Sequence, residues 1–94
     1  MYRIEIIANK SVEEEISQLL EEHITDFLYT TVPLAYGRGG SDRKLGNGTW
    51  PETNFILISY IEDKWLATAK AVIKAVKERF VGEGIKLFVM KAED

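Results

Sequence analysis

Residues 54–61 read Asn-Phe-Ile-Leu-Ile-Ser-Tyr-Ile, and this stretch decides the fold. Its apolar side chains occupy both odd and even positions. A β-strand built from it would therefore present apolar residues to both faces of its sheet. Such a pattern is typical of an interior strand that is covered on both sides. We expect residues 54–61 to form a central strand.

Three further segments are predicted to be strands. Residues 2–8 alternate between apolar and polar positions, residues 27–36 are rich in aromatic and β-branched side chains, and residues 85–90 form an apolar run near the end of the sequence. Pro33 interrupts the second of these segments. Because proline has no N–H to donate to a ladder, we expect this strand to lie at an edge of the sheet or to carry a bulge.

Two helices are predicted between the strands. Residues 12–24 have apolar side chains at helical spacing. Ser11 and Glu14, at the start of this segment, have the form of a capping box. His23 falls on this apolar stripe and is expected in the core or at its boundary. Residues 64–81 follow Asp63, a candidate N-cap, and end near Gly82 or Gly84. The first helix is acidic and the second is basic, so the two should attract each other modestly.

The resulting order, β-α-β-β-α-β, predicts an α+β fold of the ferredoxin-like type. Its four-stranded antiparallel sheet has the order 4-1-3-2, with both helices on one face, and residues 1–94 make one domain. This topology places Pro33 on an edge strand and residues 54–61 in the interior. Two independent features of the sequence therefore agree with one fold.

This topology leaves one face of the sheet without helices. The second, third and fourth predicted strands nevertheless carry apolar residues for both faces, among them Val32, Leu34, Phe88 and Met90. Soluble monomers rarely expose so large an apolar patch. We expect other copies of the chain to cover it, in a closed homo-oligomer.

Composition narrows the class of protein. The chain has no cysteine, a net charge of −3 and a hydrophobic content of 46%. It contains no apolar run of membrane-spanning length and no recognisable secretion leader, so we expect a cytoplasmic protein that does not insert into membranes. The acidic balance argues against nucleic-acid binding. An RNA-binding module of the same fold is the weakest alternative, because the first and last strands lack its aromatic signature.

No catalytic or metal-binding constellation is evident. His23 is the single histidine, the serines have no activating partner, and the paired glutamates resemble solvated helix faces. We therefore predict that the chain is not an enzyme, with no catalytic residue and no metal site.

A long polar loop, residues 36–51, reads YGRGGSDRKLGNGTWP and holds five of the seven glycines. Loops of this length are commonly functional. It is not a P-loop, and no helix follows it. Its glycines allow an anion-binding nest beside Arg38, Arg43 and Lys44, and Trp50 is either a packing anchor or a flat surface for a partner. The alternative is a hairpin excursion whose charges only keep it solvated.

Two segments resemble the PII nitrogen-regulatory signalling proteins. The sequence runs from Thr30-Thr31-Val32 into Tyr36-Gly37-Arg38, then a long loop and a return strand, as does the family around its T-loop. Residues 84–89, Gly-Ile-Lys-Leu-Phe-Val, are similar to the motif that closes the family's B-loop. The resemblance covers nearly the whole chain in element order, although few residues match.

This resemblance implies a cytoplasmic homotrimer that binds an adenine nucleotide (ATP, ADP or AMP) in clefts between subunits. Gly37 and Arg38 match the loop base that contacts nucleotide, and Gly84 and Lys86 match the B-loop. A T-loop-like excursion at about residues 37–53 would be read by a partner protein, a transporter or an enzyme. The partner-binding residues of that excursion would be Arg43, Lys44 and Trp50.

The sequence also departs from the family pattern. Residues 80–84 are shorter than the family's B-loop, Ala35 replaces a glycine, and residues 37–53 contain no tyrosine for modification. The resemblance therefore implies a small anionic ligand, with no certain cofactor. The alternative is a structural or metal-associated trimer of the CutA type, which shares the topology but does not bind nucleotide.

Overall fold

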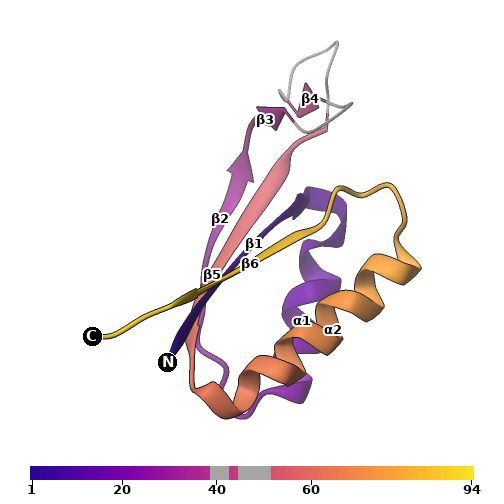
Figure 1. Cartoon of the computed structure of the whole chain (residues 1–94). Helices are drawn as coiled ribbons and strands as arrows, with labels where there is room; N and C mark the ends of the chain where they lie inside the picture. The colour runs from indigo at the N-terminus through magenta and orange to yellow at the C-terminus, as the bar shows by residue number, and fades with distance from the viewer. Residues whose placement is uncertain (39–42, 45–51) are drawn as a thin grey trace.

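The computed structural model describes residues 1–38, 43–44 and 52–94. In chain order its elements are β1 (Tyr2–Asn9), the 3-10 turn η1 (Lys10–Val12), α1 (Glu13–His23), β2 (Thr30–Ala35), β3 (Gly37–Arg38), β4 (Arg43–Lys44), β5 (Asn54–Ile61), the 3-10 turn η2 (Asp63–Trp65), α2 (Leu66–Arg79) and β6 (Lys86–Lys91). The two helices cover one face of the main sheet, and the two termini lie close together (Figure 1). The predicted α+β, ferredoxin-like fold is confirmed.

The main sheet has the order β2-β5-β1-β6, and every neighbouring pair is antiparallel. Read from the β6 edge, this is the predicted order 4-1-3-2. The apolar strand β5 lies in the interior, as its sequence indicates. Its alternate residues Phe55 and Leu57 are fully buried beneath the helices, because strand side chains alternate between faces.

The core lies between this face and the helices. Its largest fully buried side chains include Ile4 and Ile6 from β1, Ile16 and Leu20 from α1, and Ile73 and Val76 from α2. The acidic and basic helices are also joined at the surface, where Arg79 Nη1 lies 2.6 Å from Glu15 Oε1. This ion pair joins the two helices with the signs of charge that the sequence predicts.

Strand β2 is an edge strand, and its register shifts between Val32 and Ala35, on either side of Pro33. Both expectations for this proline are confirmed. The strand begins at Thr30, three residues later than predicted. The preceding segment forms an irregular connection in which Asp26 has a φ of 53°, and the Ser59 hydroxyl donates to the Leu28 carbonyl at 2.6 Å.

Both predicted N-caps are wrong. Asn9, not Ser11, caps the turn before α1, because its side chain accepts from the backbone N–H of Ser11 at 3.0 Å. Asp63 lies inside η2, where its carboxylate accepts from the N-terminal ammonium of Met1. His23 is exposed at the last residue of α1 rather than buried. Both caps were misplaced because a 3-10 turn precedes each α-helix, so the chain begins to turn earlier than the local pattern indicates.

The face of the sheet opposite the helices is mostly apolar, and no described element covers it (Figure 1). We call it the open face. Cross-strand register places Ile7, Ile56 and Val32 on one row of it and Glu5, Ile58 and Phe88 on the next. Its exposed apolar residues include Val32, Tyr60, Phe88 and Met90. The predicted two-sided apolar character of these strands is confirmed.

Candidate ligand-binding region at the loop end of the sheet

One end of the sheet gathers all the described residues for which the sequence predicts ligand binding. Here β1 and β2 end, β5 and β6 begin, and the short β3–β4 ladder extends beyond them (Figure 1). We call this the loop end. In the ladder Gly37 pairs with Lys44 and Arg38 with Arg43. Trp50 lies outside the described residues.

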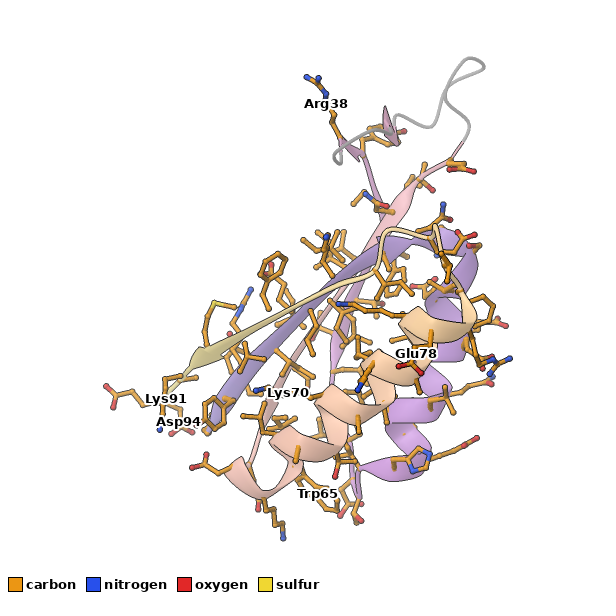
Figure 2. The ribbon with its side chains drawn as sticks, turned by 45° about the vertical axis from the view of Figure 1, so that its right-hand side comes forward. Arg38, Trp65, Lys70, Glu78, Lys91 and Asp94 are labelled. Atoms are coloured by element: carbon orange, nitrogen blue, oxygen red, sulfur yellow. The ribbon has the colours of Figure 1, made fainter. Side chains whose placement is uncertain are left out.

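Gly37 and Arg38 continue from the edge strand β2. The position of Gly37 is crowded, because a Cβ there would lie 3.2 Å from the Asn54 side-chain nitrogen. The glycine therefore lets the excursion leave close to the start of β5. Arg38 is exposed and extends away from the body of the protein (Figure 2).

Gly84 and Lys86 belong to the opposite edge. Gly82 and Gly84 have φ values of +94° and +63°, a conformation that favours glycine, and they shape the turn between α2 and β6. Lys86 is exposed at the first position of β6. Within the part of the chain that the structure describes, neither Arg38 nor Lys86 forms an ion pair, so both cations are free to meet an anion.

The sheet keeps these two pairs apart within one subunit. Strands β2 and β6 are separated by β5 and β1, which amounts to three strand spacings, or about 14 Å. A single phosphate or carboxylate group at Lys86 is therefore too far from the β2 edge to contact it. The structure brings all four residues to one end of the sheet but not into one contact.

A hydrogen-bonded network that the sequence analysis missed lies between the two edges. Asn9 is 6% exposed, and its backbone N–H donates to the Glu83 carbonyl at 3.1 Å. Its side-chain Nδ2 donates to Glu52 Oε2 at 3.3 Å. The Ser11 hydroxyl donates to Glu83 Oε2 at 2.9 Å, and the Lys10 N–H donates to the Thr53 carbonyl at 2.8 Å.

This network joins the return of the excursion, at residues 52–53, to the turn that carries Gly84. One signal in the sequence could have revealed it: Asn9 is a polar residue at the end of a strand, next to a helix start, where asparagine commonly caps. Its partners Glu52 and Glu83 are distant in sequence, so local pattern alone does not identify them.

Two ionisable groups with shifted pKa values lie at the other end of the sheet. The Tyr29 hydroxyl donates to Glu21 Oε1 at 2.6 Å, and this hydrogen bond raises the pKa of Tyr29. The hydrogen bond from the N-terminal ammonium lowers the pKa of Asp63. Neither group lies near the residues with predicted binding roles.

The same far end holds a groove of about 370 Å³ between residues 24–28 and residues 60–65. Its lining includes Phe27, Tyr60 and Trp65, and none of the predicted site residues contributes to it. Trp65 is half-buried against the core, at the opposite end from Arg38 (Figure 2). Among the described residues there is no group of three or more His, Cys, Asp or Glu side chains that could hold a metal ion.

Comparison with solved structures identifies the fold. The chain matches CPII of Thiomonas intermedia, a nitrogen regulatory PII-like protein, in a structure bound to ADP and bicarbonate, with a TM-score of 0.76 at 18% identity. The match covers 95% of this chain and 82% of that one. The chain has the PII-like fold. The apo form of CPII matches with a TM-score of 0.66 at 15% identity, over 95% of this chain and 85% of that one.

A protein of Thermus thermophilus described as PII-like also matches, with a TM-score of 0.58 at 14% identity. That match covers 95% of this chain and 83% of the other. No protein-family model and no curated protein matches the sequence. No helix among the described residues is long and apolar enough to cross a membrane.

Proposed function

We propose that this chain is a PII-like regulatory protein of one domain. It assembles as a homotrimer through the open face and binds a small anionic ligand, with an adenine nucleotide as the leading candidate, between subunits. It then regulates a partner protein, a transporter or an enzyme, through residues 37–53. The proposal includes no catalytic step and a cytoplasmic location.

The observation that carries this proposal is the placement of two exposed cations, Arg38 and Lys86, at opposite edges of the same end of the sheet. Each lies near a glycine: the half-buried Gly37 at one edge and the exposed Gly84 at the other. Because about 14 Å separates the edge strands within one subunit, a small ligand would take its contacts from adjacent subunits. Packing of open faces around an axis would bring unlike edges together.

Two further observations support the proposal. Apolar side chains cover the open face, which is the feature expected of a surface buried on assembly. The structural neighbour CPII is bound to ADP and bicarbonate, or to ADP, AMP and bicarbonate, in its solved structures. Adenine nucleotides and bicarbonate are therefore the first ligands to test.

Titration calorimetry with ADP, AMP, ATP and bicarbonate tests the ligand. Arg38→Ala and Lys86→Ala should each weaken binding about tenfold or more, because a hydrogen bond to a charged group contributes about 1.5–3 kcal/mol. Lys70→Ala is the matched control, since Lys70 is an exposed lysine on α2, away from the loop end (Figure 2). Binding that survives both substitutions would remove these residues from the site.

The partner half of the proposal concerns Arg43, Lys44 and Trp50. Replacing Trp50 by alanine should leave nucleotide binding within about twofold of the wild type, since this variant keeps Arg43 and Lys44, which pair with Arg38 and Gly37 in the ladder. The same variant should fail to co-purify the protein that the wild type retains. A CutA-like trimer, by contrast, would show no heat of nucleotide binding at all.

A further inference from the structure

Two opposite charges lie in the middle of the open face. Arg3 and Glu5 both belong to β1, an interior strand, and alternate with the buried residues Ile4 and Ile6, so they point to the open side. The cross-strand neighbours of Arg3 are Tyr60 and Met90; those of Glu5 are Ile58 and Phe88. An ion pair therefore lies within an apolar surround.

These charges are already largely removed from water. The side chains of Arg3 and Glu5 are 29% and 28% exposed, less than the apolar Tyr60 and Phe88 around them. Arg3 Nη1 donates to the Tyr60 hydroxyl at 2.8 Å, and its guanidinium lies 5.7 Å from the centre of that ring. The pair is held in place by the side chains of the open face.

Neither charge is fully satisfied within one subunit. The distance from Arg3 Nη2 to Glu5 Oε1 is 3.7 Å, which is longer than a hydrogen bond. A guanidinium has five N–H donors, and within the described residues Arg3 uses one of them in a hydrogen bond. The Glu5 carboxylate accepts no hydrogen bond from any described residue. Both side chains can therefore form further hydrogen bonds with a partner molecule.

Any molecule that covers the open face must supply hydrogen-bond partners for both Arg3 and Glu5. Burying an ion pair whose hydrogen bonds are incomplete is costly, so a purely apolar partner surface would be rejected. A surface with charges of one sign would satisfy only Arg3 or only Glu5. A second copy of the chain offers both a carboxylate and a guanidinium, surrounded by the same apolar residues.

We infer that Arg3 of each subunit pairs with Glu5 of a neighbouring subunit across the packed open faces. This inference rests on the proposed assembly and names the contacts that make that assembly selective. In a cyclic oligomer the pairs repeat around the axis, so every charge is matched when the ring closes. The surrounding apolar residues supply the buried area of the interface, while the charges fix how the two faces align and exclude other apolar surfaces.

Charge reversal tests the inference. Arg3→Glu and Glu5→Arg should each weaken self-assembly about tenfold or more, measured by analytical ultracentrifugation, because like charges then meet at the interface. Mixing the two variants should restore part of the lost assembly as mixed oligomers, because two of the three interfaces in a mixed trimer then join opposite charges, while in either variant alone all three join like charges. Native mass spectrometry resolves them by their mass difference.

The mixture distinguishes contacts between subunits from the contact within one subunit. Each reversed chain has two like charges of its own, so an effect through the internal pair alone would not be rescued by mixing. Single variants that assemble like the wild type, or a mixture that forms no mixed oligomers, would overturn the inference. If a reversed chain fails to fold by circular dichroism, Arg3→Gln, Glu5→Gln and the double variant replace it, and a double-mutant cycle without coupling overturns the inference.

Failure of the proposed function can be distinguished from failure of the Arg3–Glu5 pairing. A wild-type protein that remains monomeric would defeat both the trimer and this pairing. A wild-type trimer whose Arg3 and Glu5 variants assemble normally would defeat only the pairing.

Discussion

The Ser11 hydroxyl donates to the Glu83 carboxylate at 2.9 Å, across 72 positions of sequence. This bond fastens the turn before α1 to the turn before β6. The backbone of Asn9 makes a second bond to Glu83, and its side chain reaches Glu52. One buried asparagine therefore holds together three segments at the end of the sheet where the ligand is proposed to bind.

Asn9→Ala should lower the free energy of unfolding by about 1–2 kcal/mol, because it removes an N-cap and leaves the Ser11 N–H without its acceptor. Urea unfolding measures this loss. Ser17→Ala is a suitable control, since the Ser17 hydroxyl donates to the Glu14 carbonyl within α1 and caps neither helix. Equal stability of the two variants would contradict the role of Asn9.

Gly84→Ala should cost about 1–2 kcal/mol of stability, because Gly84 has a φ of +63° and alanine is strained there. No atom lies within 4 Å of the position that its Cβ would occupy, so strain and not crowding causes the loss. Gly84→Asn should lose less, since asparagine tolerates this conformation. Thermal unfolding of the three proteins decides the order, and a Gly84→Asn variant less stable than Gly84→Ala would contradict it.

Because of Tyr29, the free energy of unfolding should fall at high pH. Its pKa in the folded state is raised above the ordinary value of 10.0 by the hydrogen bond to Glu21. The folded state therefore retains this proton where the unfolded state releases it. The stabilising contribution is complete below pH 10.0 and is lost as the pH rises through the folded pKa.

Absorbance at 295 nm follows the four tyrosines as they ionise. Tyr29→Phe should delete the transition of Tyr29, and Glu21→Ala should move that transition downward in pH. In urea unfolding, the advantage of the wild type over Tyr29→Phe should shrink above pH 10.0. A Tyr29 transition unmoved by Glu21→Ala would show that this hydrogen bond is not its cause.

Phe88→Glu should dissociate the proposed oligomer, because it places a second carboxylate opposite Glu5 on the open face. Val81→Glu makes the same change of charge at an apolar residue that is 85% exposed but lies in the turn before β6. Light scattering coupled to gel filtration should report a smaller mass for the first variant only. Dissociation by both, or by neither, would contradict an interface at the open face.

The sheet order was predictable because its evidence is periodic and redundant. The two-sided apolar pattern of residues 54–61 requires an interior strand, and Pro33 requires an edge strand or a bulge. Helix starts were less predictable. Ser11 and Asp63 each have the right residue type for a cap, but their side chains bind Glu83 and the N-terminal ammonium instead.

The candidate site was predictable only in part. Resemblance to the PII family indicated Gly37, Arg38, Gly84 and Lys86, and the fold brings all four to the loop end. The predicted order 4-1-3-2 also implies that β1 and β5 separate them into two groups at opposite edges. The sequence could not reveal the contacts of Asn9, because a hydrogen bond between distant segments leaves no local pattern.

Native mass spectrometry of the purified protein, with and without added ADP, tests the central claim most directly. The account predicts a species of three times the 10.7 kDa chain mass that gains ADP, and whose gain is lost in Lys86→Ala but kept in Lys70→Ala. A monomer, or a trimer that takes up no ADP, AMP, ATP or bicarbonate, would contradict it.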